Sequence, residues 1–269
     1  MGLDMKDTIE FYDSIRGVGE DNLKRLTDSQ GWSKSEFEKR GIVFDDPNRD
    51  IALTEDEIYG IMNSFPESFR NRISVGYILG NGPLWFKSEK LEVTGDVNEA
   101  LSQTSIIPSH ISHANQDKKQ NISLFKLENV DPKVARIIHG EGFIHELAHT
   151  ANFPGHTGNY EDLMNRGIVV RYDNGREVPF KKMVSEFEEL MKDSSPITNY
   201  SSFYWSNNDG KVQTDKLELA VNEELAESIA AYQLGFAMTP NPENRLNPFE
   251  DRPKIKEFVE DLINSEFGK

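Results

Sequence analysis

The sequence predicts an α+β fold, and two observations support this class. Short helical stretches come first, strand-like stretches follow, and the rest of the chain is mainly helical. With 269 residues, of which 36% are hydrophobic, the chain is long enough to bury a sizeable core. We expect one functional unit made of an N-terminal helical extension, an upper lobe and a lower lobe, at residues 1–50, 51–152 and 153–269.

The elements of the extension and of the upper lobe are predicted from turn and capping signals. Helices are expected at residues 5–18 and 21–30, and the turn signal Asp45-Asp46-Pro47 closes the extension. Thr54 and Glu57 have the spacing of a capping box, which starts a further helix. Beyond it, the pattern predicts a short helix from residue 66, a strand at 73–79, a polar loop at 102–120 and a second strand at 122–127.

A long helix is expected at residues 131–152. Asp131 followed by Pro132 is typical of an N-cap and a first helical position, and apolar residues recur at helical spacing. Gly140, inside this helix, indicates that a neighbour approaches the helix backbone closely. His139 is expected on the surface of the helix.

The lower lobe is predicted to contain a hairpin and three helices. Asn174-Gly175 between two strand-like stretches, 168–172 and 176–180, is a strong β-hairpin signal. Helical periodicity then indicates helices at residues 180–192, 217–235 and 253–267.

The net charge of −16 and the absence of cysteine exclude several classes of protein. An acidic chain repels phosphate backbones, so we expect no nucleic-acid partner. No stretch approaches the roughly 20 apolar residues of a transmembrane helix, so we expect no membrane partner. The first residues lack the apolar run of a signal peptide, which favours a cytoplasmic location, although leaderless secretion or effector delivery would leave the same sequence. Without cysteine, a metal site must use His and carboxylates.

The motif His145-Glu146-Leu147-Ala148-His149 lies in the predicted long helix. Residues four positions apart project from one face of a helix, about 40° apart, so His145 and His149 can bind the same ion, such as Zn²⁺. Glu146 lies on the flank of that face, where it can take a proton from water and pass it to a leaving amine. Two surface histidines with an incidental glutamate are the alternative interpretation.

A tetrahedral zinc site needs a third protein ligand. The predicted helix at 217–235 carries Glu223, Glu224 and Glu227, of which the first and the last share a face. One of these two can bind the ion while the other supports a ligating imidazole from behind. We favour Glu223 as the ligand, and a solvated acidic face is the alternative interpretation of this helix.

His156 is a second candidate for the third ligand. It follows His149 by seven residues and would give a three-histidine site of the metzincin type, but it lies one residue later than that pattern requires. Asn152 stands where the pattern has glycine, and asparagine tolerates the left-handed conformation of such a turn.

The two glutamate-bearing helices resemble those of the gluzincin zinc metallopeptidases. The pattern His145-Glu-x-x-His149 with Glu223-x-x-Ala-Glu227 is most similar to the lethal-factor-like and Pro-Pro-endopeptidase-like branches. The resemblance implies a two-lobed zincin fold with a small mixed sheet in one lobe and a mainly helical second lobe. It also implies Glu223 as the third zinc ligand and Glu227 as the residue that supports a ligand from behind.

The resemblance further implies an oxyanion donor and a substrate strand. In these families a tyrosine shortly before the ligand glutamate stabilises the tetrahedral oxyanion. Tyr200 is the candidate, although it precedes Glu223 by 23 residues, more than in these families, and Tyr204 is its rival. The strand before the long helix, at residues 121–127, would be an exposed sheet edge that pairs with an extended peptide.

The sequence therefore predicts a zinc-dependent metallopeptidase that acts on a peptide or protein substrate. An endopeptidase is favoured over an aminopeptidase, because the chain lacks a Gly-x-Met-Glu-Asn type motif for holding a free amino terminus. A catalytically inactive, zinc-stabilised binding module is the alternative from another class. Glu146 argues against it, because a purely structural metal site needs no base. Neither the preferred substrate nor the oligomeric state follows from the sequence.

Overall fold

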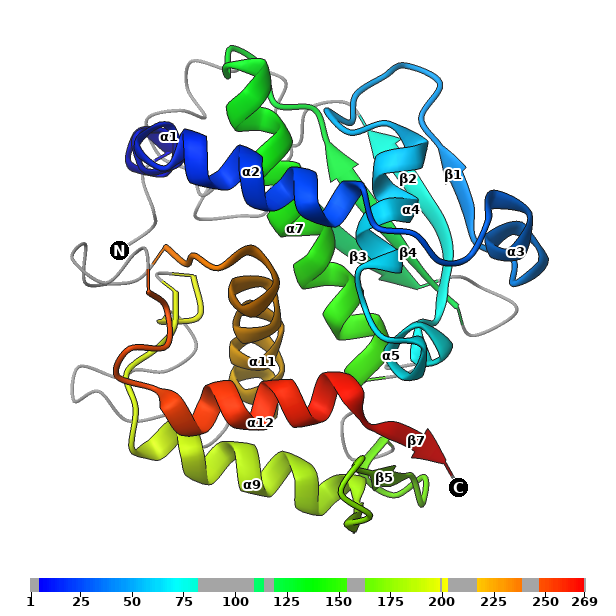
Figure 1. The fold of residues 1–269 in the computed structure, drawn as a ribbon, viewed down its shortest axis with the longest axis vertical. Helices are drawn as coiled ribbons and strands as arrows, with labels where there is room; N and C mark the ends of the chain where they lie inside the picture. Colours follow the sequence, from blue (N-terminus) through cyan, green and yellow to red (C-terminus); the bar gives the residue numbers. More distant parts are fainter. Residues whose placement is uncertain are drawn as a thin grey trace, which may run out of the picture.

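The computed structural model has a mixed α and β architecture (Figure 1). It describes residues 5–81, 109–113, 119–153, 163–198, 200–202, 217–238 and 247–268. The helices are α1 (Met5–Ser14), α2 (Arg16–Thr27), α3 (Lys34–Lys39), α4 (Glu55–Asn63), α5 (Glu67–Arg72), α7 (Pro132–Asn152), α9 (Phe180–Lys192), α11 (Leu217–Leu234) and α12 (Pro253–Asn264). The strands are β1 (Val43–Asp45), β2 (Val75–Asn81), β3 (Ser109–His113), β4 (Gln120–Phe125), β5 (Val169–Arg171), β6 (Glu177–Pro179) and β7 (Glu266–Gly268). The predicted α+β class is confirmed, and within these ranges every helix is too short or too polar to cross a bilayer.

The larger sheet has four strands in the order β1-β2-β4-β3. The first three run parallel, whereas β3 pairs antiparallel with β4 in a register that places Ile111 opposite Ile122. The prediction that residues 121–127 form an exposed edge is wrong, because β4 is paired on both sides. The edge beside β4 is β3, a strand whose pattern predicts a loop because Ile111 is its only apolar residue.

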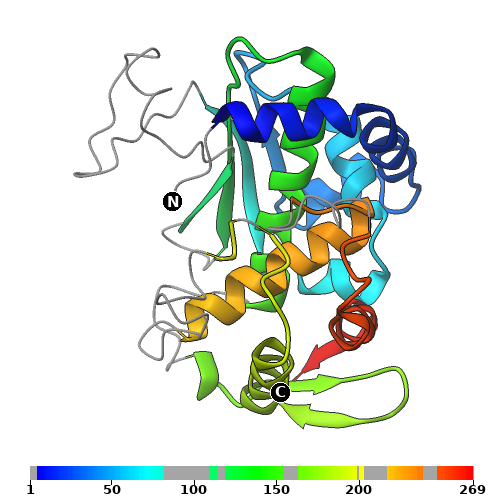
Figure 2. The ribbon, with the colours of Figure 1, turned by 90° about the vertical axis from the view of Figure 1, so that its left-hand side faces the viewer.

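Helix α7 lies at the centre of the molecule, between the large sheet and α11 (Figures 1 and 2). Its start is fixed as predicted: the Asp131 side chain accepts hydrogen bonds from the backbone nitrogens of Lys133 and Val134, at 2.9 and 3.4 Å, and Pro132 is the first helical residue. From Val134 to Asn152 nearly every residue is buried. A helix that is buried on all sides can carry polar groups only where they have partners.

His139 shows this requirement, and its predicted surface location is wrong. The side chain is fully buried, because the loop before α4 covers it. Its Nδ1 accepts a hydrogen bond of 2.8 Å from the backbone nitrogen of Ala52, and its Nε2 lies 2.9 Å from the carbonyl oxygen of Phe125. A carbonyl can only accept, so Nε2 carries the proton and the ring is neutral. Burial lowers the pKa of His139, which keeps it in this form.

The N-terminal helix α2 packs against both α7 and α11. A Cβ atom on Gly140 would lie 2.6 Å from Cδ1 of Leu23, so the close approach predicted at this glycine is confirmed and the neighbour is α2. Asn22 and Arg25 of α2 donate hydrogen bonds of 2.7 Å to the carbonyl oxygens of Leu234 and Gln233. These carbonyls belong to the last turn of α11, where the helix leaves them without partners. Residues of the N-terminal extension therefore hold the two central helices together.

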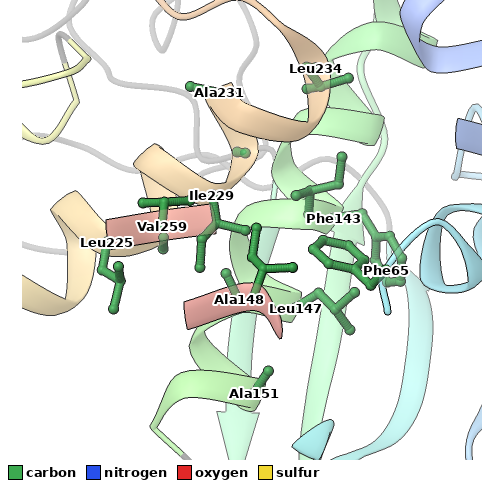
Figure 3. Close-up of a cluster of buried hydrophobic side chains, with 14 of the residues drawn as sticks. Phe65, Phe143, Leu147, Ala148, Ala151, Leu225, Ile229, Ala231, Leu234 and Val259 are labelled. Atoms are coloured by element: carbon green, nitrogen blue, oxygen red, sulfur yellow. The ribbon is translucent and has the colours of Figure 1, made fainter. Parts of the chain in front are cut away.

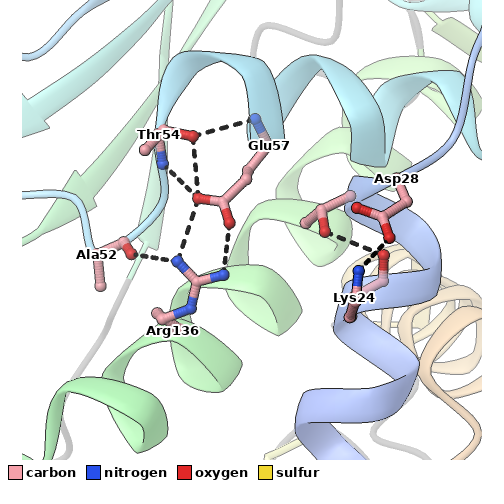
Figure 4. A network of polar contacts seen from close by, with 7 residues as sticks. Lys24, Asp28, Ala52, Thr54, Glu57 and Arg136 are labelled. Carbon is pink, nitrogen blue, oxygen red and sulfur yellow. Dashed lines mark hydrogen bonds and ion pairs between the residues drawn. The ribbon is translucent and has the colours of Figure 1, made fainter.

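The predicted capping box at the start of α4 is confirmed (Figure 4). The backbone nitrogen of Thr54 donates to the Glu57 carboxylate at 2.8 Å, and the backbone nitrogen of Glu57 donates to the Thr54 hydroxyl at 3.3 Å. Arg136 of α7 binds the same carboxylate at 2.5 and 3.1 Å and donates to the carbonyl of Ala52. Burial raises the pKa of Glu57, but Arg136 and Thr54 more than offset this and lower it. The capping carboxylate thus also joins α4 to α7.

Apolar packing between α7 and α11 forms the centre of the core (Figure 3). Ala148 faces Ile229 across the two helices, Phe143 and Leu147 extend the cluster towards Phe65, and all five side chains are fully buried. The predicted hairpin is present as β5 and β6, with Gly175 at a φ of +82°. The last helix ends earlier than predicted, because residues 266–268 form β7 and pair with β5.

Candidate metal centre

Helix α7 brings His145, Glu146 and His149 together on its buried surface. The Nε2 atoms of the two histidines lie 2.9 Å apart, and their rings meet nearly at right angles. Together with Glu146 they form a group of side chains that could hold a metal ion. This is the arrangement expected from the i and i+4 spacing on a helix.

Helix α11 supplies a carboxylate from the opposite side. Oε2 of Glu223 lies 3.4 Å from Nε2 of His145 and 3.6 Å from Nε2 of His149, and it makes no hydrogen bond within the described part of the chain. In a tetrahedral zinc site with bonds of roughly 2.0–2.2 Å, ligand atoms are about 3.3–3.6 Å apart. The three atoms therefore fit a zinc ion after a small separation of the two rings. A buried carboxylate oxygen without a partner is costly, and a cation would remove that cost.

The other ring nitrogen of each histidine faces an oxygen of α11. Nδ1 of His145 lies 2.6 Å from Oε1 of Glu227, and Nδ1 of His149 lies 2.8 Å from Oδ1 of Asn222. Protons on the two Nδ1 atoms would leave both Nε2 lone pairs free for an ion. Asn222 was not predicted as a site residue. Local spacing does not single it out, because it precedes Glu227 by five residues and therefore lies about 140° away from it around the helix.

The electrostatics of the cluster favour a positive charge between these side chains. Burial lowers the pKa of the His145 imidazole, but Glu227, Glu223 and Glu146 outweigh burial and raise it well above its usual value. Burial raises the pKa of Glu223, but His149 and His145 outweigh it and bring it well below its usual range. A divalent cation satisfies this demand for positive charge better than one proton, because all three ligand atoms can share it.

Glu224 points away from the histidines. Its carboxylate accepts a hydrogen bond of 3.0 Å from the backbone nitrogen of Ile197, and burial raises its pKa to about 7. Of the three glutamates left open by the sequence, Glu223 is the one placed beside both Nε2 atoms, and Glu227 stands behind His145.

Tyr200 lies next to the site, while two rival residues lie outside the described ranges. The Tyr200 ring meets the His145 ring edge to face, with centroids 5.8 Å apart. Tyr204, the alternative oxyanion donor, and His156, the alternative third ligand, fall in residues 203–216 and 154–162, which the structure does not describe.

Glu141 is a half-buried acid that was not singled out from the sequence. It lies one turn before His145 on the same face of α7, because four residues separate them. Although part of its surface is exposed, desolvation and the nearby Glu227 raise its pKa to about 8. The polar stripe of α7 therefore extends beyond the two histidines.

Comparisons of the chain with protein-family models, with curated proteins and with solved structures found no match.

Proposed function

We propose that this protein is a zinc-dependent metallopeptidase of the gluzincin type with a two-lobed zincin architecture. One observation carries the proposal: Glu223 of α11 meets His145 and His149 of α7 at distances that suit a tetrahedral zinc, with Glu146 beside them. Three protein ligands plus one open position are characteristic of catalytic zinc sites, whereas structural sites usually have four protein ligands.

In this proposal each side chain has one role. Zinc, when bound, supplies Lewis acidity that polarises the scissile carbonyl and acidifies water. Glu146 accepts the proton of the attacking water and delivers it to the leaving amine. Tyr200 donates a hydrogen bond to the oxyanion from the side of His145. Glu227 and Asn222 hold the ligating imidazoles in orientation and tautomer.

The substrate would be a peptide or protein segment in extended form. The edge strand β3 packs against α7 and has one side without a neighbouring strand among the described residues. We propose that the substrate backbone pairs with β3, which takes the role that the sequence pattern gave to residues 121–127. Pairing through backbone groups along a strand favours cleavage inside a chain, as in an endopeptidase.

The proposal is tested by comparing wild type with Glu146→Gln. Elemental mass spectrometry should find about one zinc per chain in both proteins, because Glu146 is not among the proposed ligands. Cleavage of fluorescein-labelled casein should be detectable in the wild type and lost in Glu146→Gln. Casein cleaved equally by both proteins, or left intact by a fully zinc-loaded wild type across a peptide library, would contradict the peptidase function.

A further inference from the structure

The segment that carries Tyr200 is held by two buried charged residues from different parts of the chain. Residues 195–198 follow α9 without forming a regular helix or strand, so their backbone polar groups need other partners. Glu224, fully buried on α11, accepts from the backbone nitrogen of Ile197 at 3.0 Å. Arg252, which is 4% exposed, donates from Nε to the carbonyl of Ser195 and from Nη2 to the carbonyl of Pro196, at 2.9 and 2.7 Å.

The two charged groups bind complementary sides of the same peptide backbone. The Glu224 carboxylate accepts a hydrogen bond from one backbone N–H group, and the Arg252 guanidinium donates to two successive backbone carbonyls. The segment therefore cannot slide or rotate without breaking several charge-assisted hydrogen bonds. Arg252 also donates to the Ser195 hydroxyl at 2.9 Å and to the carbonyl of Pro248 at 2.8 Å. Four of its five N–H groups therefore donate hydrogen bonds to described residues, and the side chain is anchored at the start of α12.

A tight buried turn connects this clamp to Tyr200. The backbone nitrogen of Ser201 donates to the Thr198 hydroxyl at 3.0 Å, and the Ser201 hydroxyl donates to the carbonyl of Thr198 at 3.2 Å. Both side chains are buried. Tyr200 lies between Thr198 and Ser201, three residues after Ile197, so the held residues 195–197 come directly before the turn that carries the ring.

We propose that Arg252 and Glu224 are positioning residues that hold the Tyr200 ring against His145. Helix α11 then contributes two adjacent residues to one site, Glu223 towards the histidines and Glu224 towards the segment of the oxyanion donor. The position of the third ligand and the position of Tyr200 are thereby set by the same helix. This inference rests on the proposed function for its catalytic meaning, but the placement of the ring can be measured without catalysis.

The position of the Tyr200 ring relative to His145 is measured by NMR of histidine-labelled, zinc-loaded protein. Tyr200→Leu removes the aromatic ring next to His145. The histidine signals that lose a ring-current shift in this variant are therefore assigned to His145. Arg252→Lys, which loses the planar fork, and Glu224→Met, which loses the acceptor, should move these signals towards the Tyr200→Leu position. Glu224→Gln keeps an oxygen acceptor for Ile197 and should leave them in place.

Arg72→Lys is the matched control for general loss of stability. Arg72 is also buried and donates to the carbonyls of Leu262 and Ile263 and to the Ser265 hydroxyl, and within the described part of the chain it makes no hydrogen bond to residues 195–198 or 200–201. This variant should lower the melting temperature without moving the His145 signals. If Arg252→Lys and Glu224→Met leave the His145 signals unchanged, or if Arg72→Lys moves them equally, the proposal is wrong.

Measuring casein turnover distinguishes a failure of the positioning proposal from a failure of the proposed peptidase function. In the wild-type background Arg252→Lys should reduce casein turnover by about tenfold, and in the Tyr200→Phe background by less than about twofold, because the phenol through which it acts is already gone. Equal losses in both backgrounds would refute positioning through Tyr200. If the wild type cleaves nothing, the peptidase function fails, while the NMR comparison still decides whether the clamp holds the ring.

Discussion

Asn22 donates a hydrogen bond of 2.7 Å to the carbonyl oxygen of Leu234, although 212 positions separate the two residues in the chain. Arg25 binds the neighbouring carbonyl of Gln233 in the same way, and Leu23 between them packs on Gly140 of α7. Helix α2 therefore touches both helices that carry the candidate metal centre. The N-terminal helices belong to the same hydrophobic core as α7 and α11.

Glu223→Ala should remove zinc from the protein. The change takes away one of three ligands and leaves a neutral cavity beside the histidines, so zinc affinity should fall by at least about 100-fold. Isothermal titration of the chelated protein with zinc measures the effect. Glu189→Ala, which removes an exposed carboxylate of α9, controls for the change in net charge and should bind zinc like the wild type. Equal affinity of Glu223→Ala and wild type would exclude Glu223 as a ligand.

Asn222→Ala should weaken zinc binding by about 10–100-fold while the ligands stay in place. The substitution removes the oxygen that lies 2.8 Å from Nδ1 of His149, so the imidazole loses its fixed orientation and tautomer. The same titration measures the loss. Asn264→Ala is the control, because this half-buried asparagine donates to the carbonyl of Glu260 in its own helix α12. An Asn222→Ala protein with wild-type affinity would show that Asn222 does not orient the ligand.

Asn22→Ala should destabilise the end of α11 by about 1–2 kcal/mol, because a carbonyl of its last turn loses its partner. Thermal unfolding measures the free energy, and faster amide hydrogen exchange at residues 230–234 would locate it. Lys24→Ala, on the same helix, breaks only an exposed ion pair with Asp28 and should change stability by less than about 0.5 kcal/mol (Figure 4). Equal losses of stability in Asn22→Ala and Lys24→Ala would show that the hydrogen bond from Asn22 does not stabilise the end of α11.

The neutral bridge of His139 should make stability depend on pH. Its pKa in the folded protein is lowered from about 6.5, so its stabilising contribution is complete above that pH and is lost as the pH falls below it. The melting temperature of His139→Gln should therefore lie below that of the wild type at pH 7.5, and the gap should narrow towards pH 5. Taking the difference between the two proteins cancels the titration of all groups that both proteins share. A gap that stays constant from pH 5 to 7.5 would contradict the prediction.

Local signals predicted the later helices well, but α3 (Lys34–Lys39) was missed and the break between α1 and α2 lies at residue 15 instead of 19–20. Long-range pairing explains the strands that were missed. The bounds of α7 follow from Asp131 and Pro132, whose capping contacts lie within one turn. By contrast, β3 has one apolar residue and exists because it pairs with β4, and β7 exists because it pairs with β5. Such strands have no distinct pattern of their own, since their partners lie elsewhere in the chain.

The same distinction applies to the candidate site. His145, Glu146 and His149 could be grouped from the sequence because one helix turn brings them together. Glu223 was favoured because a zinc site needs a third ligand, because it shares a helix face with Glu227, and because of the resemblance to gluzincins. No local spacing joins α7 to α11, so its distance from the histidines could not be predicted. His139 was misjudged because its burial depends on Ala52 and Phe125, two residues on other elements.

The hydrogen bonds of α2 to the end of α11 have a consequence for the order of events during synthesis. When His149 is added to the nascent chain, the chain already contains the residues of α2 and the histidine pair, but not Glu223 or the carbonyls that Asn22 and Arg25 bind. At about 5–20 residues per second, roughly 4–17 s pass before Leu234 is added. During that interval the nascent chain has only two of the three proposed ligands. All three are present only when the last fifth of the protein is being made, so the zinc binding that we propose would be a late step in the maturation of this chain.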